Sequence, residues 1–405
     1  MSKKILVIGI NFFPELTGIG KYTGEMVHWL AEKGYETTMV TSFPYYPYWT
    51  VQQPYTGSFY KKEVLKGGKL KVYRCPMYIP KKPTGIRRLL HEASFLISSF
   101  FVVFLLLFKK KNELILAVAP PFHLGFLALF YRFFKGGKIV YHIQDLQVDA
   151  ARELKMLPNG LFSVLFWLER LILKKVNMVS TISEGMIKRV KAKVYREVVF
   201  FPNWVNTDSF YPLMNREELK LEWGYKIEEQ IILYSGSIGE KQGLDVIVRI
   251  ADGLRHLPHL KFIICGTGPY KERLIAMAVT ANLSNVFFSP LQQSEVFNRF
   301  LNMADLHLVL QKGDASDLVM PSKLTTILAV GGLALVTAHE STTLFDVITQ
   351  NKMGIVIQPE NDVSLKQAIE QFSLATYTEQ RLRAREYASK YLNKYNILNA
   401  FLANF

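Results

Sequence analysis

The fold class of this chain is decided by residues 5–41, which read ILVIGINFFPELTGIGKYTGEMVHWLAEKGYETTMVT. Residues 5–10 form an apolar run typical of a buried strand, and a glycine-containing loop leads from it into a predicted helix over residues 21–33. A second strand is predicted at residues 37–41. This order of strand, loop, helix and strand predicts a βαβ unit with a parallel sheet.

The same alternation continues on both sides of a turn-rich stretch, FPNWVNTDSFYP at residues 201–212. A chain of 405 residues exceeds the usual size of one hydrophobic core, so we place a domain link there. Further strands are predicted at residues 114–118, 138–143 and 178–182 before the link, and at 231–234, 261–265, 285–288 and 306–310 after it.

The sequence therefore predicts an α/β protein with two Rossmann-like, doubly wound domains that face a central cleft, because ligands bind beyond the carboxyl ends of parallel strands. We expect residues 1–204 to form an N-terminal domain. Residues 205–380 are expected to form a C-terminal domain. Residues 381–405 are predicted to be a helix that packs back toward the N-terminal domain.

The charge of the chain is concentrated in its first half. The net charge is +15, and residues 1–200 carry 30 Lys and Arg against 13 Asp and Glu, whereas the remainder carries 19 against 21. Residues 93–108 are an uncharged, mostly apolar run between Arg87-Arg88 and Lys109-Lys110-Lys111. Such a run is shorter than the roughly 20 residues that cross a bilayer. Two interpretations stay open: a helix lying in the interface of anionic lipids, which the other basic clusters favour over nucleic acid binding, and a buried core helix with basic ends.

The compartment follows from the first residues and the cysteines. The short apolar run after Met1 lacks a cleavage site, so we expect a strand and not a signal peptide. Cys75 and Cys265 show no metal-ligand spacing and fit a reducing compartment. We therefore predict a cytoplasmic protein without a metal site.

Three segments that follow predicted strands of the second half contain candidate ligand-binding groups. Residues 236–243, GSIGEKQG, and the start of the predicted helix at Pro321 both offer cations and backbone N–H groups to a diphosphate. Residues 265–269, CGTGP, allow close approach of a ligand, or merely form a turn before a helix. The candidates for the donor diphosphate are Gly236, Ser237, Lys241, Ser322 and Lys323, and those for the nucleotide or sugar include Gly266 and Gly268.

In the first half, Gly18 and Gly20 follow the first strand and are candidates to approach an acceptor, or to form a tight turn. A third glycine and an acidic residue after the second strand are missing, which makes an NAD site improbable. His142 and Asp145 come at the end of another strand and are candidates to orient a sugar hydroxyl or act as a base, unless the histidine is structural. His123 and Glu15 are weaker candidates of this kind.

Together these motifs resemble family 4 of the two-Rossmann-domain (GT-B) glycosyltransferases over nearly the whole chain. Within that family the likeness is strongest to the colanic acid biosynthesis fucosyltransferase type. The segments that carry the resemblance are residues 14–20, 142–147, 202–212, 236–243, 266–269 and 320–324.

The resemblance implies a nucleotide-sugar donor in the C-terminal domain, an acceptor on the N-terminal one, and retaining transfer without a metal. The chain departs from the family pattern at Ser237, where many members have arginine, and at Thr326, where a ribose-binding glutamate is expected. The partner glutamate is replaced by Leu318, next to Asp317. By position, Asp317 and Thr326 become candidates for nucleotide or sugar contacts, and the two lysines carry more of the diphosphate charge.

We therefore predict a glycosyltransferase bound peripherally to the cytoplasmic face of the inner membrane. It would move a sugar, by resemblance fucose, from a GDP- or UDP-linked cosubstrate to a lipid-diphosphate-linked saccharide in colanic-acid-like polysaccharide assembly. Neither a cofactor nor nucleic acid is expected. The alternatives are a nucleotide-sugar 2-epimerase of the same fold and a non-catalytic, membrane-bound scaffold that keeps a sugar-nucleotide site.

Overall fold

The structure is a computed structural model that describes residues 3–15, 18–81, 85–153, 159–313, 321–340 and 342–405. The chain divides into two compact units, Met1–Phe201 and Pro202–Phe405. The division falls inside the turn-rich stretch from which the domain link was predicted. Residues 381–405 belong to the second unit, and their predicted packing toward the first domain stays a prediction.

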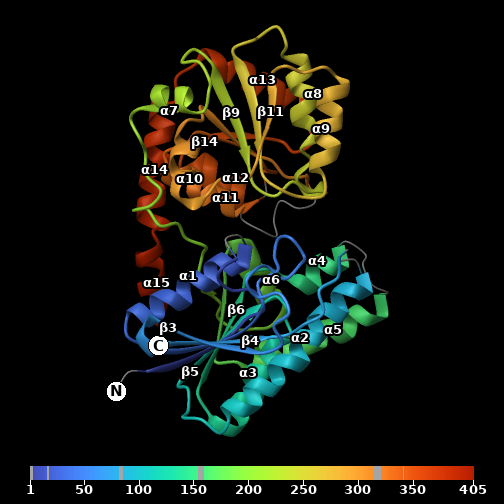
Figure 1. The fold of residues 1–405 in the computed structure, drawn as a ribbon, viewed down its shortest axis with the longest axis vertical. Helices are drawn as coiled ribbons and strands as arrows, with labels where there is room; N and C mark the ends of the chain where they lie inside the picture. Colours follow the sequence, from blue (N-terminus) through green and yellow to red (C-terminus); the bar gives the residue numbers. More distant parts are fainter. Residues whose placement is uncertain (1–2, 16–17, 82–84, 154–158, 314–320, 341) are drawn as a thin grey trace. The chain divides into compact units, whose positions relative to one another are not determined.

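The first unit is built on an eight-stranded sheet with the order β3-β4-β2-β1-β5-β6-β7-β8 (Figure 1). Neighbouring strands are parallel, except that β3 runs antiparallel to β4. β1 and β5 lie side by side at the centre of the sheet. The strands that follow β1 are added on one side of it, and those that follow β5 are added on the other, so the strand order reverses between these two strands. The strands are β1 (Lys4–Ile8), β2 (Glu36–Ser42), β3 (Lys61–Leu65), β4 (Leu70–Cys75), β5 (Leu114–Ala119), β6 (Lys138–Ile143), β7 (Met178–Thr181) and β8 (Val199–Phe200).

Helices cover both faces of this sheet, as strands that are apolar on both sides require. Side chains of α2, α3 and α5 join those of alternate strand positions in one buried cluster. The helix α1 packs against β2, and its buried residues include Met26, Val27 and Leu30. The helices are α1 (Gly18–Glu32), α2 (Gly85–Leu106), α3 (Leu124–Lys135), α4 (Gln147–Glu153), α5 (Asn159–Lys175) and α6 (Glu184–Lys193), with a short 3₁₀ turn, η1 (Lys66–Gly68).

The second unit has a six-stranded sheet in the order β11-β10-β9-β12-β13-β14, and all its paired strands are parallel. This is the doubly wound order in which the first strand lies at the centre and the fourth lies beside it. The strand order reverses between β9 and β12. The strands are β9 (Gln230–Ser235), β10 (Leu260–Cys265), β11 (Val286–Ser289), β12 (Leu306–Val309), β13 (Ala334–Thr337) and β14 (Gly354–Ile357).

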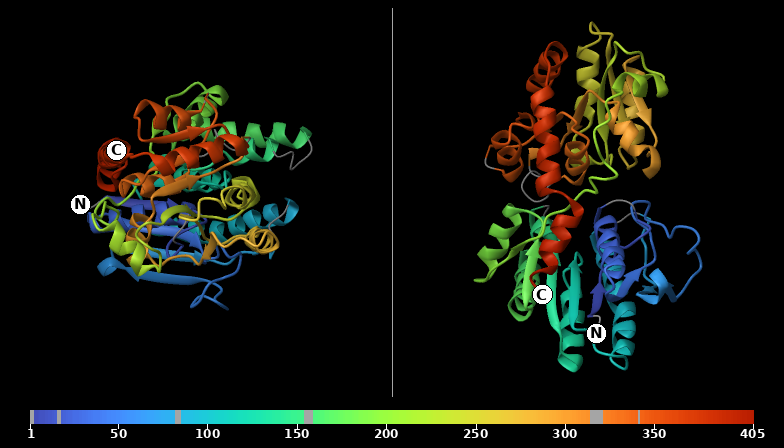
Figure 2. Two further views of the ribbon diagram at one scale, coloured as in Figure 1. Left: turned by 90° about the horizontal axis from the view of Figure 1, so that it is seen from above. Right: turned by 90° about the vertical axis from the view of Figure 1, so that its left-hand side faces the viewer.

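The faces of the second sheet are covered by different helices. α8 and α13 share one buried cluster with the strands, while α11, α12 and α14 contribute to a cluster on the other face. The right-hand view of Figure 2 shows α14 in red, running upright along this unit. The helices are α7 (Arg216–Glu222), α8 (Asp245–Gly253), α9 (Lys271–Thr280), α10 (Ser294–Asn302), α11 (Ser322–Ala329), α12 (Thr343–Gln350), α13 (Asp362–Leu374), α14 (Thr378–Tyr391) and α15 (Lys394–Leu402), with a 3₁₀ turn, η2 (Glu240–Gln242). The prediction of two doubly wound α/β domains is confirmed.

Candidate active site

The reversal point of the second sheet brings two predicted diphosphate-binding segments together. The loop after β9 begins at Gly236, and α11 begins at Ser322, one residue before Lys323. A Cβ atom on Gly236 would lie only 3.2 Å from Lys323 Nζ, so the glycine leaves room for the lysine. Ligands of doubly wound sheets bind at this position, beyond the carboxyl ends of the strands.

Lys323 has a buried ammonium for which the described residues supply no counter-charge. Its Nζ is buried and has no hydrogen-bond partner among the described residues, although the side chain as a whole is only half-buried. The ammonium lies 3.6 Å from the centroid of the Tyr234 ring, whose face compensates only part of the lost hydration. Burial lowers the pKa of Lys323 to about 7. An anionic ligand at this position would supply both the missing charge and the missing hydrogen-bond acceptor.

The predicted nucleotide loop at Gly266 and Gly268 packs directly on the loop after β9. Gly236 N donates to Cys265 O at 3.0 Å, and Ile238 N donates to Thr267 O at 2.9 Å. A Cβ atom on Gly266 or Gly268 would collide with the backbone oxygen of Gly236 or Ile238. These glycines are therefore explained by loop packing.

The remaining diphosphate candidates lie on the same two segments. Ser237 and Ser322 are exposed, and their backbone oxygens accept hydrogen bonds from Tyr234 Oη and Thr325 Oγ1 at 2.6 and 2.8 Å. Their hydroxyls are thus at the surface of the loop and of the first turn of α11. Lys241 lies in η2, and its side chain is outside the described part of the structure.

Thr326 is placed differently from its prediction as a nucleotide or sugar contact. It is buried in α11, and its hydroxyl donates to Lys323 O at 2.9 Å, one turn earlier in the helix. That geometry gives it a structural role, because its hydrogen is already used by the helix backbone. Asp317 and Leu318 lie outside the described residues, so the carboxylate predicted near this site has no described position.

In the first unit, the loop after β1 is organised by Glu15. Its carboxylate accepts hydrogen bonds from Tyr45 N and Tyr46 N, each at 2.9 Å, and from Asn11 Nδ2 at 2.8 Å. Burial raises the pKa of Glu15 to about 7 in spite of these donors. A Cβ atom on Gly20 would lie 2.6 Å from Glu15 Oε2, so Gly20 is needed for this packing. Gly20 lies inside α1, so close packing against Glu15 explains it and a tight turn does not.

Gly18 opens α1 with φ +57°, a backbone conformation that favours glycine. The nearest atom to a Cβ at this position, Cε1 of Tyr46, would be 3.7 Å away. Gly18 therefore has more open space around it than Gly20. It remains the better candidate to lie against an acceptor.

The two predicted catalytic residues lie in different surroundings. His142 is an interior residue of β6, paired with Val118 and Ser180, and its Nδ1 lies 3.0 Å from Ser180 Oγ. Burial lowers the pKa of His142 to about 3. Because its ring is enclosed beside Phe201, the predicted acceptor contact does not fit its position. Asp145 lies beyond the carboxyl end of β6 and is half-buried, as a site residue would be.

His123 is better placed than His142. It precedes α3 and follows the end of β5, the strand beside β1 at the reversal of the first sheet. Its Nε2 has no hydrogen-bond partner among the described residues, and burial lowers its pKa to about 4. The neighbouring loops are joined by a hydrogen bond from Phe122 N to Gln147 Oε1 at 3.2 Å. A neutral histidine thus lies near the loop that contains Asp145.

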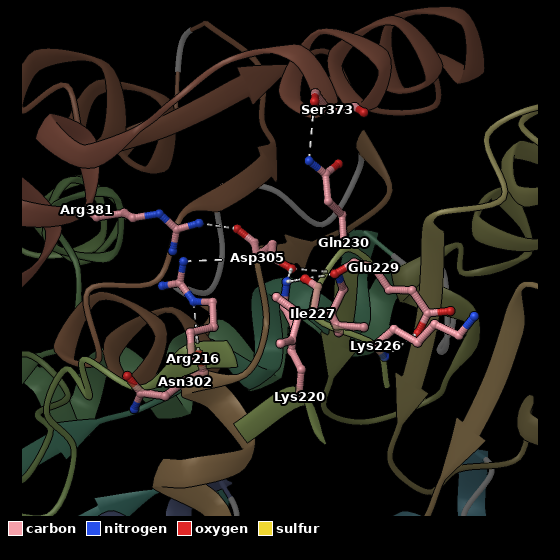
Figure 3. Close-up of polar contacts among 11 residues, drawn as sticks. Arg216, Lys220, Lys226, Ile227, Glu229, Gln230, Asn302, Asp305, Ser373 and Arg381 are labelled. Atoms are coloured by element: carbon pink, nitrogen blue, oxygen red, sulfur yellow. Dashed lines mark hydrogen bonds and ion pairs between the residues drawn. The ribbon is translucent and has the colours of Figure 1, made fainter. Parts of the chain in front are cut away.

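Sequence reasoning missed Tyr234, the last aromatic residue of β9. An aromatic side chain at the end of a strand, directly before a glycine loop, is the signal that could have identified it. It also missed a polar cluster at the amino end of β12, where Lys220 Nζ lies 2.8 Å from Asp305 Oδ2 (Figure 3). The same ammonium donates to Glu229 O at 2.7 Å, and Arg381 donates to Asp305 O. Arg216 completes the cluster, with Nη1 3.9 Å from Asp305 Oδ1.

Comparison with known families matches each half of the chain separately. Residues 17–204 match the glycosyl transferase 4-like domain, and residues 215–391 match the glycosyl transferases group 1. Two solved structures share the fold at low sequence identity. Sucrose-phosphate synthase from Thermosynechococcus elongatus has a TM-score of 0.77 at 15% identity, with 99% of this chain and 98% of that one covered. Anabaena Alr3699/HepE in complex with UDP-glucose has a TM-score of 0.68 at 12% identity, with 99% and 100% covered.

A curated relative extends the match over nearly the whole sequence. It is WcaI of Escherichia coli K12, which is named, provisionally, a colanic acid biosynthesis glycosyl transferase. The two are 42% identical over 408 aligned positions, which cover 98% of each chain. With both halves matched by glycosyltransferase domains and a relative this similar along its length, the chain belongs to family 4 of the GT-B glycosyltransferases.

Proposed function

We propose that this glycosyltransferase binds the diphosphate of a nucleotide-sugar donor at the carboxyl ends of β9 and β12, in the second unit. The buried ammonium of Lys323, which has no hydrogen-bond partner in the described part of the chain, is the observation that carries this proposal. A buried cation costs free energy unless a ligand supplies the counter-charge, and the loop after β9 leaves a glycine beside it. The fold neighbour HepE is in complex with UDP-glucose, which supports a donor of this class.

The chemistry follows from the charge that develops during transfer. As the bond between the sugar and the diphosphate breaks, negative charge grows on the leaving phosphate, and an ammonium beside it stabilises the transition state more than the ground state. Lys323 takes this role, and Lys241 in η2 and the exposed hydroxyls of Ser237 and Ser322 add donors. We propose that these groups suffice without a metal, and that configuration is retained, as the family resemblance implies.

The acceptor is proposed to bind the first unit at the carboxyl ends of β5 and β6. Asp145 would accept the proton of the attacking hydroxyl, or orient it, and neutral His123 would hold the acceptor through a hydrogen bond. Gly18 would let the acceptor approach the loop after β1. His142 has no part in this arrangement, because its ring is enclosed in β6.

The nature of the acceptor is proposed from the relative. Because WcaI is named for colanic acid biosynthesis, we propose that this chain acts in the assembly of a similar cell-surface polysaccharide. The acceptor would be a lipid-diphosphate-linked saccharide, and the enzyme would lie peripherally on the cytoplasmic face of the inner membrane. Fucose from a GDP-linked donor is the sugar that the family resemblance suggests.

The donor is tested by thermal shift with a panel of GDP- and UDP-linked sugars. A ligand at a hundred times its dissociation constant stabilises the folded state by about 2.7 kcal/mol, so the true donor should stand out. Lys323→Met should abolish that shift, and Lys366→Met, at a half-buried lysine of α13, should keep it. If the thermal shift were unchanged in Lys323→Met, the diphosphate would not bind at this position.

Transfer is tested by the release of free nucleotide with and without a synthetic lipid-diphosphate-linked saccharide. We expect release only when the acceptor is present. Conversion of the donor into a 2-epimer without an acceptor would identify an epimerase instead. Donor binding with no turnover on any acceptor would indicate a scaffold.

A further inference from the structure

One helix of the first unit has apolar residues on both of its faces. The inner side of α2 packs into the core through Phe95, Val103 and Leu106. Its outer side is also apolar, and Ile97, Phe101 and Leu105 recur every four residues with 61%, 57% and 61% of their surfaces exposed. A helix on the surface of a soluble domain usually turns polar residues outward. The outer stripe of α2 therefore needs an apolar partner.

The exposed apolar surface continues onto α3. Phe133 and Phe134, at the end of that helix, are 83% and 58% exposed. Phe130 joins the two helices, because its ring centroid lies 4.9 Å from that of Phe100 and 5.2 Å from that of Phe134. Directly after α2, Phe108 adds a ring that is 77% exposed. A continuous aromatic ridge thus runs from one helix to the next.

A third helix extends the same side of the unit. α3 contacts both α2 and α5, side chains of all three helices join one buried cluster, and Figure 1 labels the three in the first unit. Trp167 of α5 is 58% exposed, and Leu161 and Val164 are 41% and 51% exposed. Contiguous apolar patches of this kind mark interaction sites in soluble proteins. Tryptophan is favoured at the boundary between lipid and water.

Basic side chains border this surface. Lys109, Lys110 and Lys111 follow α2 and are all exposed, and a Cβ atom on Gly136, just after α3, would lie 3.2 Å from Lys111 Nζ. Lys111 therefore lies against the end of α3, and the three lysines directly follow Phe108 in the sequence. At the end of α5, residues 174–175 add two exposed lysines. Exposed aromatic rings with lysines beside them complement the interface of an anionic bilayer.

Packing limits how deeply this surface can enter a bilayer. α2 has 22 residues and is, among the described residues, the helix that is long and apolar enough to cross a membrane, yet 44% of its most apolar window is buried inside the unit. His91 and Glu92, near its start, are buried there as well. A helix whose inner side belongs to the core cannot be surrounded by lipid without unfolding the unit. The geometry suits shallow contact with one leaflet.

We infer that the outer sides of α2, α3 and α5 form a docking surface for anionic lipid headgroups and the acyl chains below them. The inference extends the proposed peripheral location from residues 93–108 to a surface of three helices. It names Phe133 and Phe134 as anchors that insert, and Lys109–Lys111 as the cluster that selects anionic lipid. It does not depend on the donor or on the transfer reaction.

The test is co-sedimentation with vesicles of phosphatidylcholine, with and without phosphatidylglycerol. The chain should bind the anionic vesicles and release them at high salt. Phe133→Ser with Phe134→Ser should weaken binding at least about tenfold. Replacing Lys109, Lys110 and Lys111 by Gln should weaken it about a hundredfold on anionic vesicles and little on neutral ones. The matched control is Leu374→Ser, at a leucine of the second unit that is 89% exposed, and it should bind like the parent.

Two results would overturn the inference. One is equal vesicle binding by the Phe133→Ser, Phe134→Ser variant and the parent chain. The other is a parent dimer in gel filtration that becomes monomeric in this variant while vesicles bind neither, which would identify a second copy of the chain as the occupant. Thermal midpoint and donor-induced stabilisation are measured in parallel. They should match the parent, so that loss of membrane binding is distinguished from misfolding and from failure of the proposed donor site.

Discussion

A buried lysine ammonium lies at each end of the second sheet, and the two differ in the partners that the described residues give them. At the amino end, Lys220 is 5% exposed, and its ammonium has Asp305 Oδ2 at 2.8 Å and Glu229 O at 2.7 Å (Figure 3). At the carboxyl end, Lys323 has an aromatic ring and no hydrogen-bond acceptor among the described residues. The fold thus supplies partners where a cation stabilises the structure. Where a ligand is expected to bind, the described residues leave the cation unpaired.

The largest effect should come from breaking the paired lysine. Lys220→Met would leave the Asp305 carboxylate and the Glu229 carbonyl without their ammonium, and removing one partner of a buried pair typically costs about 3–5 kcal/mol. Arg216, at 3.9 Å, compensates only in part. Chemical denaturation should show the loss in the free energy of unfolding. Donor-induced stabilisation should persist at temperatures where the variant is folded.

A surface ion pair in the same unit provides the control for this prediction. Arg249 lies 2.6 Å from Asp245 and 2.7 Å from Asp362, and about half of its side chain is exposed. Arg249→Gln should cost less than about 1 kcal/mol, because solvent screens such pairs. If both variants lost the same small amount, burial at Asp305 would not be what makes Lys220 important.

Replacing Lys323 should affect turnover strongly and the free energy of unfolding little. Lys323→Met should lower turnover about 10²–10³-fold, equivalent to about 3–4 kcal/mol, because it removes a cation aimed at the leaving phosphate. The same change should leave the free energy of unfolding unchanged or raise it, since an uncompensated buried charge disappears. Steady-state kinetics and denaturation of one preparation give both numbers.

A structural role for Lys323 would give a different pair of results. The variant would then lose stability as Lys220→Met does, and its remaining folded fraction would turn over normally. Lys323→Arg distinguishes charge from geometry. Because the guanidinium is larger and Gly236 lies so near, we expect Lys323→Arg to restore little activity.

A smaller effect should appear in the pH dependence of stability. The pKa of Lys323 falls from 10.5 to about 7 on folding, so the unfolded state binds more protons between these values. The free energy of unfolding should therefore rise with pH in this window, by about 2 kcal/mol between pH 7 and 9, while below pH 7 the full cost of the buried charge is present. Lys323→Met should lack this rise. Equal slopes in the two proteins would show that folding does not lower the pKa of Lys323.

The order of strands, glycine loops and helices was predictable because it depends on local sequence, and it placed Lys323 at the right end of the sheet. The Asp305 cluster was not predictable, because Asp305 is 76 positions from Arg381 and lies still farther along the chain from Lys220 and Arg216. No local pattern marks such contacts. Gly20 shows the same limit: Glu15 fills the space that an acceptor was predicted to occupy.

The prediction that His142 contacts the acceptor does not fit the structure for another reason. Its strand was predicted to run to Ile143, so the histidine precedes the strand end by one residue, and strand pairing on both sides encloses it. For α2, the sequence predicted a helix from the uncharged run, whereas the structure begins it at Gly85, because its more polar first turns also belong to the helix. Whether other elements of the fold cover the outer side of α2 depends on tertiary packing, so the local sequence could not predict it.

The smallest change tests whether Tyr234 stands in for the missing partner of Lys323. Tyr234→Phe keeps the ring face 3.6 Å from the ammonium but removes the donor to Ser237 O, which lies at 2.6 Å. A lost neutral hydrogen bond costs about 1 kcal/mol, so stability should fall by that amount with donor affinity nearly unchanged. Tyr234→Leu removes the ring as well and should cost a further 0.5–2 kcal/mol at pH 6, where the lysine is charged, and less at pH 9. If the free energies of unfolding of the two variants differed by the same amount at both pH values, the ring would act by packing alone. The difference between the two buried lysines would then come only from the carboxylate of Asp305 beside Lys220.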